Sequence, residues 1–198
     1  VDDYFWLREK TNPAVMAHLQ AEDAYTQSVM KPTEPLQHKL YNEMLSHIKQ
    51  TDANVPYRQG NYFYYSRTEE GKQYPIFCRK KGSVEAPEEI VLDVNELAKG
   101  QKFMSIGLFE PSNDGNLLAY STDNTGYRQY VLQFKDLRTG ELLPDRAERV
   151  TSFSWANDNK TFFNVIEDAV TKRSDKFFRH VLGSDKTDLV YDEKDELF

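Results

Sequence analysis

The 198-residue sequence predicts a mainly β fold in which an N-terminal α-helical hairpin precedes part of a β-propeller. Three observations support this fold class. Apolar residues recur every three or four positions over the first fifty residues, which is the period of an amphipathic helix. From about Val55 the period changes to two, and aromatic and β-branched residues gather in short runs typical of strands. A turn-and-strand segment then repeats along the chain.

Two helices are expected before residue 50. Asn12 and Pro13 are a helix-start signal, with asparagine as the N-cap and proline at the first helical position. Lys31 ends this helix, because the residue before a proline is disfavoured in the α region. A second helix restarts at Thr33 and Pro35. The apolar stripes of the two helices are Ala14, Ala17, Ala21, Tyr25 and Val29, and Leu36, Leu40, Met44, Leu45 and Ile48. Joined by a short turn, they predict a helical hairpin.

Short strands fill the rest of the chain, most of them following a Gly, Pro or Asp-Asn turn signal. Residues 60–66 resemble residues 115–121, and residues 159–165 are a weaker third copy; the copies begin 55 and 44 residues apart. Four strands per unit at a period of about 40–50 residues indicate a β-propeller. The alternative is three unrelated hairpin pairs in a sandwich; the repeated order of turn and strand favours the propeller over it.

The expected domains are a helical arm over residues 1–53 and a partial propeller over residues 54–198. The three blades are expected at about residues 54–101, 102–147 and 148–198. A propeller has about 4–8 blades, each buried between its neighbours, so three blades leave two apolar faces uncovered. This count, and Val1 in place of an initiator Met, predict a piece of a longer protein. Exposed blade edges also predict a dimer or larger species, which sedimentation would detect.

Composition excludes several classes of protein. The formal net charge of −7 argues against a nucleic-acid binder that neutralises phosphates. No apolar run approaches the roughly 18–20 residues that cross a membrane. The single cysteine, Cys78, rules out a disulfide framework and favours a reducing, cytoplasmic location.

No catalytic, cofactor-binding or metal-binding residue is predicted, and no cofactor is expected. The Gly-x-Ser-x-Gly elbow of a serine hydrolase is absent from the chain. Cys78 lies in a predicted strand beside Phe77 and is expected to be a small buried thiol rather than a nucleophile.

The remaining polar candidates are interpreted as structural. His18 and Glu22 are expected to be a solvated pair on the first helix, and His38 and His47 to lie on opposite faces of the second. His180 is expected to be an edge or outward residue of a strand. The runs at residues 114–115 and 123–126 are expected to be hairpin turns, because they lack the further oxygen ligands of a calcium loop.

Several long segments resemble one known family. They are residues 2–9, 12–25, 40–58, 64–75, 118–123, 126–130 and 135–140. Together they resemble the N-terminal region of the prolyl oligopeptidase family of serine peptidases, most closely its oligopeptidase B branch. The likeness is strong over residues 2–143 and looser beyond.

The resemblance implies a seven-bladed propeller that covers the active site of a C-terminal α/β-hydrolase domain, on which the helical arm packs. It implies cleavage of short peptides after Arg or Lys. The Ser–Asp–His triad of the family lies in the hydrolase domain, so no catalytic residue carries over and this segment is non-catalytic by itself. An acidic interior would attract basic peptides. The alternatives are a prolyl-specific oligopeptidase and a free-standing interaction module derived from a propeller.

Overall fold

The computed structural model of the protein describes residues 2–198. The chain divides into two compact units after Lys49. The first contains the helices η1 (Phe5–Arg8), α1 (Pro13–Met30), η2 (Lys31–Thr33) and α2 (Glu34–Ser46). The start of α1 is as predicted: Asn12 Oδ1 accepts a hydrogen bond of 2.9 Å from the Ala14 amide, and Pro13 is the first helical residue. No helix among residues 2–198 is long and apolar enough to cross a membrane.

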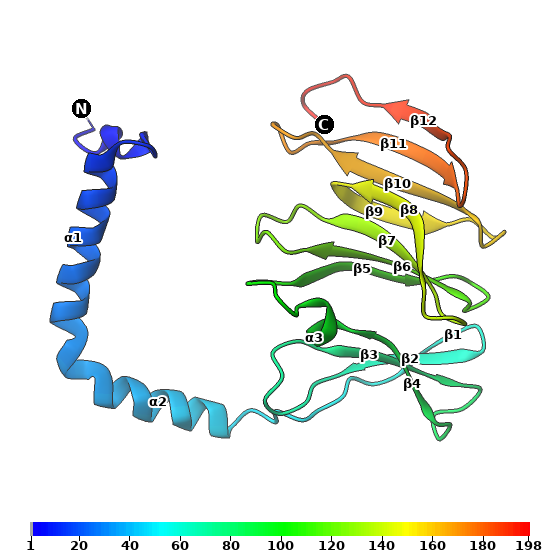
Figure 1. Cartoon of the computed structure of the whole chain (residues 1–198), viewed down its shortest axis with the longest axis horizontal. Helices are drawn as coiled ribbons and strands as arrows, with labels where there is room; N and C mark the ends of the chain where they lie inside the picture. The colour runs from blue at the N-terminus through cyan, green and yellow to red at the C-terminus, as the bar shows by residue number, and fades with distance from the viewer. Residues whose placement is uncertain (1) are drawn as a thin grey trace. The chain divides into compact units, whose positions relative to one another are not determined.

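The two helices do not fold back into the predicted hairpin. Helix α1 ends at Met30, but Lys31 keeps helical dihedrals (φ −49°, ψ −42°) despite the proline that follows it. Pro32 lies in the first turn of η2, where a missing amide N–H is tolerated. No residue of this junction reverses the chain, so α2 continues from α1 through a bend (Figure 1). Many stripe residues are therefore exposed: Tyr25, Val29, Leu36, Leu40, Met44 and Ile48.

The second unit contains three antiparallel four-stranded sheets stacked in chain order (Figure 1). Within each sheet, every strand pairs with the strand next to it in the sequence, so each sheet is a meander. A short helix, α3 (Val94–Leu97), connects the first sheet to the second. The strands are β1 (Tyr57–Gln59), β2 (Tyr62–Arg67), β3 (Ile76–Lys81), β4 (Glu88–Asp93), β5 (Ser105–Pro111), β6 (Leu117–Asp123), β7 (Val131–Asp136), β8 (Leu142–Glu148), β9 (Val150–Trp155), β10 (Thr161–Glu167), β11 (Ser174–Val181) and β12 (Thr187–Asp192). The mainly β class and the four-strand repeat are confirmed.

The repeated segment corresponds to the turn between the first and second strands of each sheet. Gly60, Gly115 and Asn159 occupy equivalent places in the three turns, with positive φ angles of 59°, 71° and 56°. Glycine has no steric penalty in this conformation, and asparagine tolerates it better than most residues. The weaker third copy therefore keeps the backbone geometry of the first two, although its sequence differs.

These turns touch one another from sheet to sheet. The first turn approaches the second so closely that a Cβ atom on Gly60 would lie 3.2 Å from the Asn113 carbonyl oxygen. The second turn joins the third through a hydrogen bond of 3.2 Å from the Asp114 amide to Asn159 Oδ1. The stacking of the sheets is thus set at their turns.

Arg79 locks the first and second sheets together. Its guanidinium lies 4.0 Å from the centre of the Tyr62 ring, donates 2.5 Å to the carbonyl oxygen of Gly115, and pairs at 2.7 Å with Glu89. The Tyr62 ring lies directly against Gly115, where an added Cβ atom would be 2.5 Å from the ring. Only glycine fits this position.

Two aromatic cores fill the spaces between the sheets. Strand β6 belongs to both, because Leu118 and Tyr120 face the first core while Ala119 faces the second. The buried members are Tyr64, Val91, Leu92, Leu118 and Tyr120 in the first core, and Ala119, Leu132, Phe134, Val150 and Phe162 in the second. The middle sheet is buried on both faces. The first and last sheets keep exposed apolar residues: Ile90, Leu189, Val190 and Tyr191.

Replacing Gly115 with Ala should destabilise the sheet unit by about 2–4 kcal/mol. The new methyl group collides with Tyr62, and alanine is strained at a φ of 71°. Chemical denaturation of both proteins measures the difference.

Gly126→Ala is the matched control, because Gly126 has a φ of 78° but no neighbouring atom within 4 Å of the position that the new methyl group would take. It isolates the backbone strain, about 1–2 kcal/mol. Equal losses in the two variants would show that the Tyr62 contact is not a constraint.

Candidate functional site

The first strands of the three sheets converge at one end. Gln59 Nε2 donates a hydrogen bond of 3.1 Å to the Pro111 carbonyl oxygen, which joins the end of β1 to the end of β5. Trp155 Nε1 donates 2.9 Å to the Glu110 carbonyl oxygen, which joins the end of β9 to the same segment. The strands β5 and β9 also lie against each other. In a ring of such sheets, these strands are the ones that border the central channel. We call β1, β5 and β9 the inner edge.

Tyr57, Glu110 and Trp155 form the chemically distinctive part of the inner edge. Burial, and then the charge of Glu110, raise the pKa of Tyr57 above its usual range. The pKa of Glu110 is itself raised by partial desolvation. Among residues 2–198 the Glu110 carboxylate has no ion-pair partner, so its charge is left uncompensated near Tyr57. Such a carboxylate can accept a cationic group from a ligand.

The acidic excess of the chain is not concentrated on the inner edge. The strands β1, β5 and β9 contain one basic residue, Arg58, and one acidic residue, Glu110. Arg58 is already engaged, because its Nε donates 3.2 Å to the Gly60 carbonyl oxygen. Glu110 is thus the one acidic side chain that these three strands offer to a ligand.

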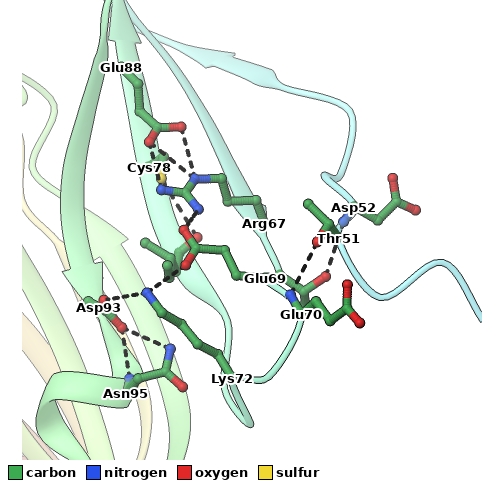
Figure 2. A network of polar contacts seen from close by, with 12 residues as sticks. Thr51, Asp52, Arg67, Glu69, Glu70, Lys72, Cys78, Glu88, Asp93 and Asn95 are labelled. Atoms are coloured by element: carbon green, nitrogen blue, oxygen red, sulfur yellow. Dashed lines mark hydrogen bonds and ion pairs between the residues drawn. The ribbon is translucent and has the colours of Figure 1, made fainter.

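A second polar feature holds the beginning of the sheet unit against the first sheet (Figure 2). Thr68 Oγ1 donates 2.7 Å to the Gln50 carbonyl oxygen, and the Thr68 amide donates 2.8 Å to the Asp52 carbonyl oxygen. The Glu70 amide donates 3.1 Å to Thr51 Oγ1. These bonds hold residues 50–54 beside the end of β2, so the chain enters the sheet unit at a defined place.

Ion pairs hold the turn to which that segment is bonded. Figure 2 shows the Arg67 guanidinium between two carboxylates: it binds both oxygens of Glu88 at 3.1 Å from Nε and also pairs with Glu69. Lys72 lies between Glu69 at 2.6 Å and Asp93 at 3.8 Å. Burial alone would raise the pKa of Glu88, but hydrogen bonds from Arg67 and Tyr65 outweigh it and lower the pKa. The network therefore has a structural role, because each of these charged side chains is bound to another member of the network.

Cys78 is buried in the middle of β3, as the sequence predicts. Desolvation, and then the charge of Glu88, raise the pKa of its thiol to about 11. A thiol with such a pKa is almost fully protonated at neutral pH and is a poor nucleophile.

Three of the other polar candidates, His18, Asp114 and Asp123, make contacts with residues close to them in the sequence or on the same unit. The His18 ring packs 5.4 Å from the Trp6 ring, and no cluster of metal-binding side chains occurs within residues 2–198. Asp114 and Asp123 close hairpin turns, as predicted: Asp123 accepts hydrogen bonds from the amides of Thr125 and Arg128.

The prediction for His180 is wrong. It lies on β11, an interior strand of the third sheet, and its side chain is 12% exposed. Its Nε2 is 2.9 Å from Asp145 of the second sheet, and its Nδ1 is 2.8 Å from Thr187 Oγ1. Alternation along the strand places His180 on the same face as Phe178, which turns toward the second sheet. The sequence carries no signal for Asp145, because the pair is 35 residues apart.

Stacked meander sheets whose first strands converge are part of a β-propeller. The family model described as "Prolyl oligopeptidase, N-terminal beta-propeller domain" matches residues 1–198, and the chain therefore belongs to this family. This confirms the resemblance seen in the sequence.

Named relatives agree with this family. The chain is 42% identical to dipeptidyl aminopeptidase BI of Pseudoxanthomonas mexicana and 35% identical to protease 2 of Moraxella lacunata, over its whole length in both cases. It spans about 30% of the length of each. Oligopeptidase B from Leishmania major has a similar structure, with a TM-score of 0.88 and 33% identity over 100% of this chain and 29% of that one.

The thiol of Cys78 should react very slowly with a thiol reagent in the native protein. At pH 8, three units below a pKa of about 11, about one thiol in a thousand is ionised. Reaction with 5,5′-dithiobis(2-nitrobenzoic acid), followed by absorbance with and without denaturant, measures the ratio of rates. A native rate equal to the denatured rate would contradict the buried assignment.

Proposed function

We propose that this chain is the gating segment of a serine oligopeptidase, and that it controls peptide access to an active site outside residues 1–198. Three things support the proposal: the family, the peptidase names of the relatives, and the convergence of the first strands at one inner edge. A ring that covers an active site admits short peptides and keeps the reaction away from bulk water. The convergence of the first strands at the inner edge is the main structural support for this role.

We propose cleavage after Arg or Lys, as in the oligopeptidase B branch. The support in this chain is Glu110, an exposed carboxylate whose pKa is raised by partial desolvation and which has no ion-pair partner among residues 2–198, at the inner edge beside Tyr57. A cationic side chain passing this edge would gain a favourable contact with both the carboxylate and the aromatic ring.

The helical arm over residues 1–53 is proposed to pack on an α/β-hydrolase domain through its exposed apolar stripe residues, for example Leu36, Leu40 and Met44. The propeller would then comprise residues 54–198, with blades at about 54–101, 102–147 and 148–198. A cytoplasmic location is proposed because the one cysteine is a buried reduced thiol.

The chain by itself should not hydrolyse peptides. We expect no turnover of fluorogenic Arg- and Lys-containing peptides, because neither a nucleophile elbow nor an activated thiol is present. Fluorescence release measures this, with trypsin as the positive control. Turnover that a serine-directed inhibitor abolishes, in material free of host peptidases, would contradict the non-catalytic assignment.

In the full-length peptidase, Glu110→Gln should raise KM for Arg and Lys substrates about two- to fivefold and leave kcat unchanged. The effect should shrink at high salt, because screening weakens the attraction. Steady-state kinetics at two salt concentrations measure both.

Glu96→Gln is the matched control, since Glu96 is an exposed carboxylate on α3 that pairs with Lys99. It should leave KM unchanged. An equal rise in KM for a neutral substrate would show that Glu110 acts on folding or gating rather than on the cationic side chain.

A further inference from the structure

A cavity of about 590 Å³ lies between the second and third sheets. One wall is β8, and the other is formed by β10, β11 and the turn that follows β11. The same two sheets are in contact at β5 and β9. Its volume is in the range of sites that bind small ligands. The cavity is distinct from the inner edge and belongs entirely to the sheet unit.

The rim of the cavity is built from groups that satisfy one another. Asp145 Oδ1 is 2.9 Å from His180 Nε2 and accepts 2.8 Å from the Gly183 amide, and Thr187 is bonded to the other nitrogen of the same ring. This brace joins the second sheet to the third across the cavity. Both donors reach the same oxygen of Asp145, Oδ1.

Two other polar groups line the cavity without partners. Asn164 is 4% exposed, and its side-chain amide makes no hydrogen bond within residues 2–198. Arg149 also lines the cavity, and its buried Nη1 has no hydrogen-bond partner among the described residues. A buried polar atom in a folded protein nearly always has a partner, so Arg149 Nη1 is an exception, and the Asn164 amide is left free to bond a ligand or water.

The backbone of Arg149 adds to this observation. Its φ is 57°, a left-handed conformation that a large side chain rarely adopts. It is the single residue between the end of β8 and the start of β9, and its carbonyl oxygen accepts 2.9 Å from the Glu167 amide. The guanidinium is therefore attached to a backbone that the sheets hold in place.

The remaining surface of the cavity is largely apolar. Phe162, Ile166 and Phe178 come from one face of the third sheet, and Ala147 from the opposite wall. Two further carboxylates, Glu148 and Asp185, are on exposed residues, and Glu148 is 3.5 Å from Arg146. A ligand in this cavity thus meets a cation, an amide and apolar side chains together.

We propose that the cavity binds the C-terminal residue of a short peptide. The Arg149 fork fits a terminal carboxylate, the Asn164 amide can both donate to and accept from a peptide group, and the phenyl rings suit an apolar last side chain. A bare inorganic anion would leave the Asn164 oxygen and the apolar walls unmatched. This site goes beyond the proposed gating role, because binding here requires no catalysis.

Calorimetric titration of the chain tests the proposal with N-acetyl-L-leucyl-L-leucine as the probe. Saturable binding is expected, about tenfold to a hundredfold tighter than for the same peptide with a C-terminal amide, because the amide removes the charge-assisted bond. Absence of saturable binding up to about 10 mM, or equal affinity for acid and amide, overturns the proposal.

Arg149→Asn removes the guanidinium and keeps a residue that tolerates positive φ. It should weaken binding of the acid probe about tenfold to a hundredfold and leave the amide probe unaffected. Arg128→Asn is the matched control, because Arg128 has a φ of 59° and lies outside this cavity. Unchanged affinity in Arg149→Asn, or an equal loss in Arg128→Asn, overturns the assignment.

Asn164→Leu separates a ligand role from a structural one. Leucine has a similar size, so removing an unpartnered buried amide should leave the melting temperature equal or higher while probe affinity falls at least about tenfold. A lower melting temperature with unchanged affinity would show that Asn164 serves the fold and overturn its place in the site.

Discussion

The structure of the sheet unit depends on one constraint: each four-stranded sheet has two apolar faces, and both must be covered. Only the middle sheet meets this condition within the described chain, because β6 contributes to both aromatic cores. The burial is strongest there, where Leu118 and Ala119 are both fully inaccessible on opposite faces. Each sheet thus excludes solvent from the facing side of its neighbour. This mutual burial stabilises the blades of a propeller.

Polar contacts align the sheets that apolar burial brings together. Hydrophobic contact is not directional, so it cannot set the register between two stacked sheets. The stacked turns supply that register, since Arg79 binds the Gly115 carbonyl oxygen and Asn159 binds the Asp114 amide. Lys135 adds another bond between the first two sheets, 3.0 Å to the Val91 carbonyl oxygen. A bond to a backbone oxygen is made whatever side chain is present, so the same device can recur in turns of different sequence.

The same geometry produces both surfaces to which we assign binding. Sheets that meet at their first strands must diverge toward their last strands. The inner edge is therefore tight, with Trp155 bonded to the Glu110 carbonyl oxygen, and the outer region opens into the cavity braced by His180 and Asp145. Within residues 2–198 the polar groups follow this division: Glu110, a carboxylate without a counter-ion, is at the inner edge, and Arg149, whose Nη1 has no hydrogen-bond partner, lines the cavity.

The sequence alone determined the elements, because hydrophobic period and turn chemistry are local: Asn12 as a cap, Gly60 and Gly115 as left-handed turns, and a small buried thiol at Cys78. The sequence also identified the family, because long segments of it match that family. Only the tertiary structure decided the bend at Lys31. This residue stays helical although the proline after it disfavours that conformation, because η2 accommodates the proline. It alone placed His180 against Asp145 and, among residues 2–198, left Glu110 without an ion pair and Arg149 Nη1 without a hydrogen bond. These relations depend on residues far apart in the chain that meet only when the sheets stack.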